Sequence, residues 1–162
     1  MAEKKSNVIR IVAAKKKPDT RKSSEKKFGK PVLALGFCII PSLMMRAQAR
    51  LGLNPAQFNI IMQLADIWWD PERKPFPKKE LLAERMGMSG RQIQRHVAEL
   101  EKAGLVKRVG RTRPGRGKTS NEYDLSGLVK KLKDLEPEFT KMQEDNRLSR
   151  KNVTLPAHRR KA

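Results

Sequence analysis

The chain is poor in the residues that form disulfides, bind metals and cross membranes. It has one cysteine and two histidines among 162 residues, so no disulfide framework or cysteine–histidine metal site can be assembled. No apolar run approaches the roughly 20 residues that a membrane helix needs. The N-terminal stretch VIRIVAA is interrupted by Arg10, which does not suit a secretory signal. We therefore expect a cytoplasmic protein with no membrane partner, no metal and no cofactor.

Groups that could perform catalysis are equally scarce. His96 and His158 are far apart in sequence, and no residue set suggests general acid–base or nucleophilic chemistry. The tripeptide Gly117-Lys118-Thr119 imitates the end of a phosphate-binding P-loop, but the glycine required five residues earlier is replaced by Thr112. We expect no catalytic residue, and the chain is not predicted to be an enzyme. The acidic pair Glu99 and Glu101 is expected to face solvent.

Positive charge is abundant and unevenly distributed. The formal net charge is +20, and three segments hold all of the excess. Residues 1–30 carry 11 Lys/Arg and 3 acids, whereas residues 106–118 and 147–162 each carry 6 Lys/Arg and no acid. The remaining body is balanced. This distribution predicts a polyanionic partner held by two basic tails and one basic loop, although basic tails can also serve solubility alone.

The stretch PKKELLAERMGMSGRQIQRHVAELEKAGLVKRV, residues 77–109, has the pattern of a helix, a tight turn, a second helix and a strand. Ile93, Val97 and Leu100 follow one another at i,i+4 and i,i+3 spacing, which forms a single apolar stripe on the second helix. Gly87 is expected to end the first helix. The exposed face opposite the stripe is then rich in arginine and glutamine, the side chains that fork onto guanine and adenine in the major groove.

The second helix also has clear end signals. Ser89 and Gln92 have the spacing of a capping box, and Gly104 supplies the left-handed residue that commonly follows a helix. The segment RTRPGRGK then predicts a basic hairpin, because proline and glycine favour turns. Tyr123 and Leu125 are the inward candidates on its return strand.

At these residues the chain resembles the winged helix-turn-helix domains of bacterial transcription regulators and of plasmid and phage replication proteins. The resemblance covers about residues 54–125 and rests on ELLAERMGMSGRQIQRHVAELEKAGLVKRV, RTRPGRGK and SNEYDL. It implies a fold that is mainly α with a small β-hairpin wing, in a bacterial, nucleoid-associated protein. It also implies base contacts from the second helix, residues 89–103, and backbone contacts from the wing, residues 111–118. The implied DNA-binding residues are Ser89, Arg91, Gln92, Gln94, Arg95, Arg111, Arg113, Arg116 and Lys118.

The rest of the chain is predicted to flank this domain. Residues 1–30 are expected to be a disordered basic arm, residues 31–136 the winged helix with flanking helices, and residues 137–162 a helix end and a basic disordered tail. An extended lead-in is expected over 31–41. Further helices are expected over 42–52, capped by Ser42, over 54–68, opened by Asn54-Pro55, and over 126–146, capped by Ser126 and broken or bent near Pro137. Of the adjacent Trp68 and Trp69, one is expected in the core.

Three functions fit these patterns. The first is a sequence-preferring double-stranded DNA-binding transcriptional regulator, with a homodimer as a possible state. The second is a plasmid or phage replication initiator or partition-type protein that binds origin repeats. The third is a non-specific architectural nucleic-acid-binding protein whose basic arms dominate binding. The sequence leaves open whether the last helix folds back on the domain or pairs with a second copy.

Overall fold

The structure is a computed structural model that describes residues 20–115 and 117–154, without the side chains of residues 20–22, 113, 117, 118 and 151–154. The chain divides into two compact units, residues 1–37 and residues 38–162.

The first unit contains two helices in its described part, α1 (Thr20–Phe28) and α2 (Lys30–Ala34). Disorder was expected through residue 30, and this expectation is wrong for α1; residues 1–19 lie outside the described residues. Basic residues in the last turn of α1 favour its formation, because they oppose the negative end of the helix dipole. The extended lead-in expected over 31–41 is likewise helical up to Ala34, since proline is tolerated in the first turn of a helix.

The second unit begins with α3 (Ser42–Arg46) and α4 (Pro55–Ile67). The predicted cap by Ser42 is wrong, because Pro41 is the N-cap residue and no side chain caps α3. The predicted cap of α4 by Asn54 is confirmed. The Asn54 side chain accepts from the Gln57 backbone N–H at 2.8 Å, and the Gln57 side chain accepts from the Asn54 N–H at 3.0 Å. This reciprocal capping box fixes the start of the central helix.

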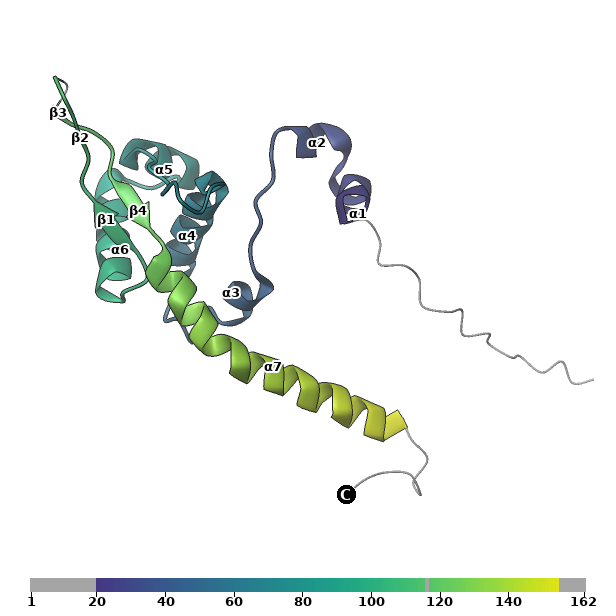
Figure 1. The fold of residues 1–162 in the computed structure, drawn as a ribbon. Coiled ribbons are helices and arrows are strands. Elements are labelled where there is room, and N and C mark those ends of the chain that lie inside the picture. Colours follow the sequence, from purple (N-terminus) through teal and green to yellow (C-terminus); the bar gives the residue numbers. More distant parts are fainter. Residues whose placement is uncertain (1–19, 116, 155–162) are drawn as a thin grey trace, which may run out of the picture. The chain divides into compact units, whose positions relative to one another are not determined.

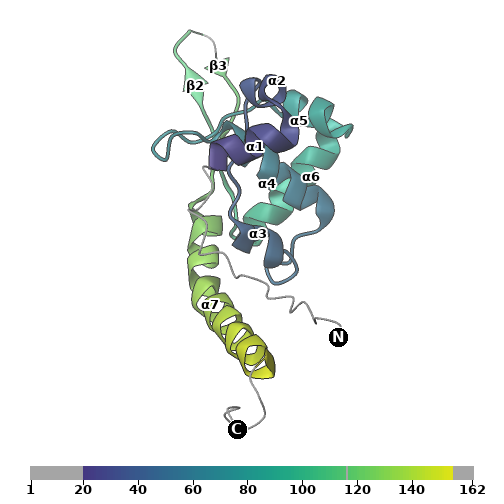
Figure 2. The same cartoon turned by 90° about the vertical axis from the view of Figure 1, so that its right-hand side faces the viewer.

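Two helices follow at the sharp turn that the sequence predicts. They are α5 (Lys79–Met86) and α6 (Gly90–Lys102), and both pack with α4 (Figures 1 and 2). Gly87 ends α5 with φ 61°, and Gly104 follows α6 with φ 65°. Both values lie in the left-handed region that glycine adopts at little cost, so the two helix ends form where expected.

The wing is a hairpin in two short pieces. At its base, β1 (Lys107–Val109) pairs antiparallel with β4 (Glu122–Asp124). Towards its tip, β2 (Thr112–Arg113) pairs with β3 (Gly117–Lys118). Two residues separate β1 from β2, whereas three separate β3 from β4, so the return strand carries one extra residue. Such an inserted residue bends a hairpin and interrupts its pairing, which accounts for the division of the predicted continuous strands.

The core lies where the helices meet the base of the wing. Trp68 packs partly buried against this core and Trp69 is exposed, so the prediction that one tryptophan joins the core is confirmed. Tyr123 and Leu125 point inward, also as predicted. The buried apolar residues are Met44, Ala47, Leu51, Leu53, Ile60, Ile61, Leu64, Leu82, Ile93, Val97, Leu100, Leu105, Val106, Tyr123, Leu125 and Leu128.

The last helix, α7 (Ser126–Thr154), is much longer than predicted. The expectation was a break or a bend near Pro137. The helix is continuous there and runs past residue 146, so the expected break and the expected disordered tail are wrong over these residues, whereas Figures 1 and 2 show α7 bending along its length. Residues 155–162 lie outside the description. Figures 1 and 2 show α7 leaving the end of β4 and extending away from the other helices of this unit. Pro137 lacks a backbone N–H and its ring crowds the carbonyl four residues earlier, so it weakens and bends the helix at an exposed position without ending it.

The first turn of α7 is fastened to the turn that follows α6. The Leu128 N–H donates to the Leu105 carbonyl at 3.0 Å, and Lys131 Nζ donates to the Ala103 carbonyl at 2.7 Å. Gly127 makes this contact possible: a Cβ atom built there would lie 2.2 Å from the Gly104 carbonyl oxygen. The structure thus confirms the predicted fold class, mainly α with a small hairpin wing, and adds a long helix anchored at the base of the wing.

Gly127→Ala should therefore destabilise the protein. The clash is with backbone rather than with a flexible side chain, so we expect a loss of about 1–3 kcal/mol in the free energy of unfolding, measured by urea denaturation. Gly110→Ala is the matched control, because no atom lies within 4 Å of its added Cβ. Equal stabilities of the two variants would contradict this account of the α7 contact.

Acid should weaken the same junction through Asp124. Its carboxylate pairs with Lys74 Nζ at 2.8 Å and accepts from the Ser126 N–H at 2.9 Å, so Asp124 satisfies a backbone donor at the start of α7; the cap by Ser126 itself stays a prediction. The hydrogen bond from Lys74 is the main cause that lowers the Asp124 pKa from 3.8 to about 2. Because the folded-state pKa is depressed, this stabilisation is complete above pH 3.8 and is lost as the pH falls to about 2.

Urea denaturation across that pH range should show a smaller acid loss of stability in Asp124→Asn than in the unchanged protein. Asp124→Asn should also be the less stable of the two at neutral pH. Parallel pH profiles would show that Asp124 does not contribute in this way.

Candidate nucleic-acid interface

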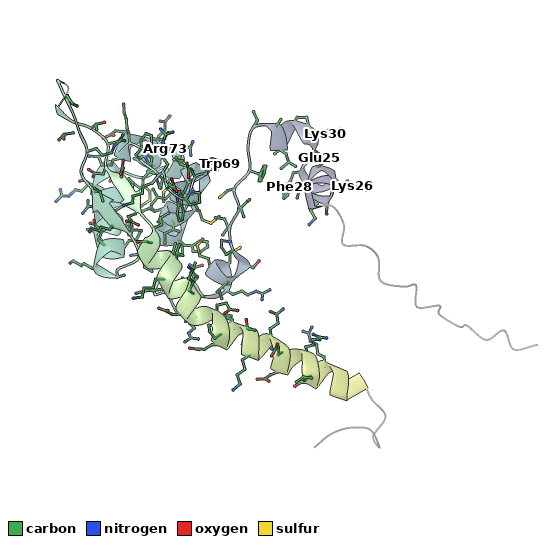
Figure 3. All side chains as sticks on the ribbon, viewed as in Figure 1. Glu25, Lys26, Phe28, Lys30, Trp69 and Arg73 are labelled. Atoms are coloured by element: carbon green, nitrogen blue, oxygen red, sulfur yellow. The ribbon has the colours of Figure 1, made fainter. Side chains whose placement is uncertain are left out.

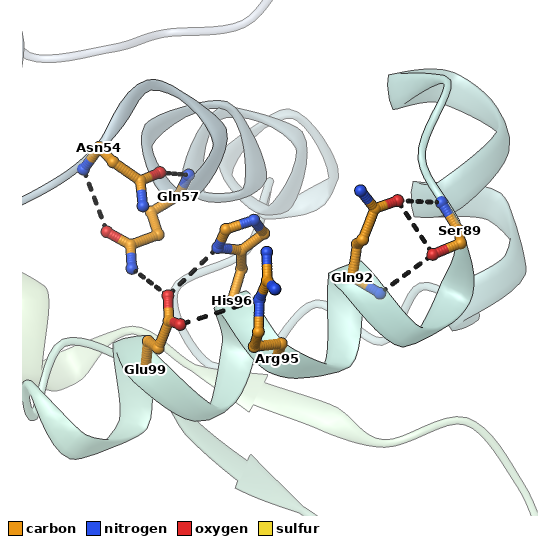
Figure 4. Close-up of polar contacts among 7 residues, drawn as sticks. All are labelled: Asn54, Gln57, Ser89, Gln92, Arg95, His96 and Glu99. Carbon is orange, nitrogen blue, oxygen red and sulfur yellow. Dashed lines mark hydrogen bonds and ion pairs between the residues drawn. The ribbon is translucent and has the colours of Figure 1, made fainter.

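The helix predicted to read DNA starts at a capping box (Figure 4). The Ser89 backbone N–H and hydroxyl both donate to Gln92 Oε1, at 2.8 and 2.9 Å, and the Gln92 N–H donates to Ser89 Oγ at 3.3 Å. These bonds confirm the predicted box and satisfy N–H groups that have no partner inside the helix. They also occupy the carbonyl oxygen of the Gln92 side chain, which leaves its amide nitrogen as the polar group available to a ligand.

The rest of α6 is divided between a buried and an exposed face. Ile93, Val97 and Leu100 are each at most 2% exposed, as their spacing predicts. The predicted contact residues Arg91, Gln94 and Arg95, like Ser89 and Gln92, are exposed. Within the described part of the chain, Arg91 and Gln94 have no hydrogen-bond or ion-pair partner, whereas Arg95 Nε lies 4.0 Å from Glu99 Oε1. The fold therefore brings the five predicted residues of this helix to one end and one side of it.

A polar network holds the middle of α6 against α4. Glu99 Oε2 accepts from Gln57 Nε2 at 2.8 Å and lies 3.2 Å from His96 Nδ1, so three side chains join the two helices (Figure 4). The hydrogen bond with His96 is the main cause that lowers the Glu99 pKa. His96 is buried, and Glu99 is only half exposed. The expectation that Glu99 faces solvent holds only in part, because Gln57, 42 residues earlier, draws its carboxylate towards α4.

The end of α6 is joined to the wing by a second acidic side chain. Glu101 accepts from the Arg108 backbone N–H at 2.8 Å and from Arg108 Nε at 2.7 Å. The side-chain bond from Arg108 is the main cause that lowers the Glu101 pKa. Glu101 is thus a ligand of the first wing strand rather than a solvent-facing residue, which corrects the sequence expectation. These bonds tie the end of α6 to the strand that leads into the wing.

The loop before α5 fastens the other side of the wing. The Tyr123 N–H donates to the Pro75 carbonyl at 2.9 Å, and Lys74 pairs with Asp124 as described above. Arg111 Nε lies 3.1 Å from Glu122 Oε1, and its guanidinium lies 4.4 Å from the centre of the Phe76 ring. A cation over an aromatic face is attracted by the ring quadrupole. The loop thus serves as a brace for the base of the wing.

Phe76 holds a second cation, because the Arg73 guanidinium lies 5.2 Å from the same ring centre. Figure 3 labels Arg73 and Trp69, both on the loop that follows α4. Arg111 is one of the predicted DNA-binding residues, and its contacts with Glu122 and Phe76 leave its side chain about one-quarter exposed. Its position suits it to hold the wing; direct contact with DNA stays a prediction.

The tip of the wing contains the remaining predicted contacts. Backbone pairing places Arg113 opposite Gly117 and Thr112 opposite Lys118. The side chains of Arg113 and Lys118 lie outside the described ones, as does the whole of Arg116. Gly117-Lys118-Thr119 enters a hairpin strand rather than a helix, which agrees with the rejection of a P-loop.

An open hollow of about 530 Å³ lies between α5, α6 and the return strand of the wing. Gln94 lines it from α6, and Lys78 and Lys79 line it from the start of α5. Sequence reasoning missed these two lysines, although they directly precede the helix-turn-helix and could have been flagged by their charge and position. Thr119, Ser120 and Asn121 complete the polar wall on the wing side.

Other kinds of site find no support in the described residues. No group of three or more His, Cys, Asp or Glu side chains there could hold a metal ion. No described helix has the length and apolar character needed to cross a membrane.

Comparisons with known proteins identify the central part of the chain. Residues 51–106 match the family model of a helix-turn-helix domain, whereas the sequence search finds no matching curated protein. Among solved structures, the N-terminal domain of DnaD protein from Geobacillus kaustophilus HTA426 is 22% identical at a TM-score of 0.51, covering 77% of this chain and 96% of that one. A MarR-family transcriptional regulator from Rhodococcus sp. RHA1 is 21% identical at a TM-score of 0.38, covering 86% and 84%. The match of residues 51–106 to the family model confirms the predicted helix-turn-helix.

Phe76→Leu should loosen the wing while leaving the helices in place. It removes the ring that faces Arg111, an interaction of about 0.5–1 kcal/mol at exposed sites. We expect the amide protons of residues 109–122 to exchange roughly two to five times faster with solvent, as measured by hydrogen–deuterium exchange. Phe58→Leu, on α4, makes the same change of side chain away from the wing. Unchanged exchange in the wing of Phe76→Leu would contradict the role given to this ring.

Proposed function

We propose that this protein binds double-stranded DNA with sequence preference and acts as a transcriptional regulator. The carrying observation is the exposed start of α6, where Arg91 and Gln94 have no partner in the described part of the chain. Exposed arginine and glutamine at the start of a helix that follows a tight turn are the groups by which helix-turn-helix proteins read base edges. The match of residues 51–106 to a helix-turn-helix domain supports this assignment.

The proposed contacts differ in kind along the interface. Arg91, Gln94 and Arg95 supply base and nearby phosphate contacts, while Ser89 and Gln92 keep the helix end in place. Both donors of Ser89 are used by the Gln92 side chain, so of these two residues only Gln92 has a donor left for the DNA. Gln92 has its amide nitrogen for this purpose, since its oxygen serves the capping box. Arg95 exchanges the distant carboxylate of Glu99 for a phosphate or a base at small cost, because exposed ion pairs of this length contribute little.

The wing is proposed to hold the DNA backbone. Arg113, Arg116 and Lys118 supply the charge, and Arg111 reaches a phosphate from the base of the wing while Phe76 keeps it in position. The basic segments 1–30 and 147–162 add affinity with little selectivity, because neutralising phosphates does not depend on base sequence. In this arrangement the protein needs no metal, no cofactor and no catalytic group, and it works on the nucleoid in the cytoplasm.

Selection of bound sequences from a random duplex library, with the full-length protein at about 150 mM salt, tests the proposal. An enriched motif near promoters would support a regulator, whereas a repeat array at an origin would support a replication or partition role instead. Tight binding without enrichment would overturn sequence preference and favour the architectural function.

Arg91→Ala and Arg95→Ala should each reduce discrimination between the selected site and unrelated DNA. Each lost bidentate contact is worth about 1–3 kcal/mol, and fluorescence anisotropy titrations on both duplexes measure it. Lys102 is an exposed cation at the far end of α6, so Lys102→Ala is the matched control. It should lower the affinity for both duplexes equally or for neither. Site preference that survives both arginine changes would exclude α6 as the reading helix.

Lys118→Ala should weaken binding to all DNA sequences alike and reduce the slope of log affinity against log salt concentration by about one unit.

A further inference from the structure

The second half of α7 extends beyond the surface that its first half covers. Leu128 is 4% exposed, and Leu132, Leu135 and Phe139 pack partly buried against the core. From residue 141 to residue 150 every side chain is exposed, including Met142 at 51%. A helix that carries little of its surface against its own domain gains stability chiefly from packing on something else.

Apolar residues of α7 recur at alternating intervals of four and three, from Leu128 to Met142. This alternation is the heptad spacing of a coiled-coil seam, and it continues from the buried half of the helix into the exposed half. Pro137 falls opposite the seam, where it does not obstruct a partner. The seam positions with described side chains are Leu128, Leu132, Leu135, Phe139, Met142, Asn146 and Ser149.

The exposed part of the seam forms one wall of a groove. A hollow of about 610 Å³ lies between α3 and α7, with Phe139 and Met142 as its apolar lining. Its remaining lining is basic or polar, and includes arginines 46, 147 and 150. An occupant of this groove must therefore be apolar along one line and acidic beside it.

We propose that α7 of a second copy of this chain occupies the groove, and that the two helices form a parallel, in-register coiled coil from Phe139 onward. The second α7 carries the same apolar line, with Glu138 and Asp145 flanking it, which is the combination that the groove requires. This inference does not depend on the proposed DNA-binding function.

The charge pattern selects the parallel orientation. In a parallel pair, Asp145 on one helix faces Arg150 on the other, and Glu138 faces the neutral Gln143. Arg150 has five donors, so it can serve this carboxylate together with contacts inside its own chain. Glu138 already pairs with Arg50 of its own chain and does not need a partner across the seam. In an antiparallel pair centred on the same turns, Glu138 would face Asp145, and two carboxylates would repel each other.

Asn146 supports the same arrangement. It occupies a seam position, where a single asparagine from each helix fixes the register and favours two strands at a cost in stability. Only about two heptads of the seam are free, so the dimer is expected to be reversible and to depend on protein concentration. Both winged helices would then lie at the same end of the coiled coil.

Sedimentation equilibrium of the full-length protein without DNA tests the orientation. The unchanged protein should form dimers as its concentration rises, and Asp145→Arg should raise the dimer dissociation constant about tenfold, because both symmetric ion pairs become repulsive. The matched control Glu144→Arg makes the same change of charge off the seam and should leave the constant within about twofold. Asp145→Arg combined with Arg150→Asp should restore dimerisation.

Disulfide trapping tests the register. In a Cys38→Ser background, Asn146→Cys should give a disulfide-linked dimer under mild oxidation, because equivalent seam residues face each other only in a parallel, in-register pair. Glu144→Cys, on the outer side of the helix, should give little. A protein that stays monomeric at every concentration would overturn the proposal. So would an Asp145→Arg variant that dimerises more tightly, because this result identifies an antiparallel pair. DNA binding can succeed or fail independently of all these results.

Discussion

The arrangement of this protein depends on the burial of one apolar stripe on α6. Ile93, Val97 and Leu100 are buried together, and burying these three positions fixes the rotation of α6 about its own axis. The residues opposite the stripe are then exposed whatever their chemistry. In this chain they are arginines and glutamines, and the polar bonds of Glu99 and Glu101 hold the helix in that orientation. A core-packing constraint therefore determines which side chains are offered to a ligand.

The cations around the interface fall into two groups with different physical roles. Arg108 and Arg111 are held by carboxylates, and Arg111 also lies over the ring of Phe76. Each is therefore part of the framework that relates the wing to the helices. Arg91 has no such partner in the described part of the chain. Charge alone does not separate the two groups, since all of these residues are arginines.

Gly127 links the winged helix to the rest of α7. Its missing side chain lets the first turn of α7 approach the carbonyl of Gly104, two residues beyond the end of α6. A parallel pair of these long helices would place two reading helices on one assembly, which is how a two-fold symmetric protein addresses two half-sites on DNA. Under this proposal, α7 would attach the winged helix of each copy to the dimer.

The sequence by itself determined the features that neighbouring residues decide. The capping boxes at Asn54 and Ser89, the left-handed Gly87 and Gly104, and the inward stripe of α6 all depend on contacts within a few residues. Patterns of that range are legible in a single chain, and they were sufficient to predict the helix-turn-helix and its exposed face.

Only the tertiary structure decided the contacts between residues far apart in the chain. Gln57 meets Glu99 across 42 positions, Phe76 meets Arg111, and Lys74 meets Asp124. The spacing of residues within one segment does not predict such contacts, because they form only after the apolar faces of several elements have packed together. For the same reason, the sequence identified Arg111 as a basic wing residue but could not show that its charge is held by Glu122 and Phe76.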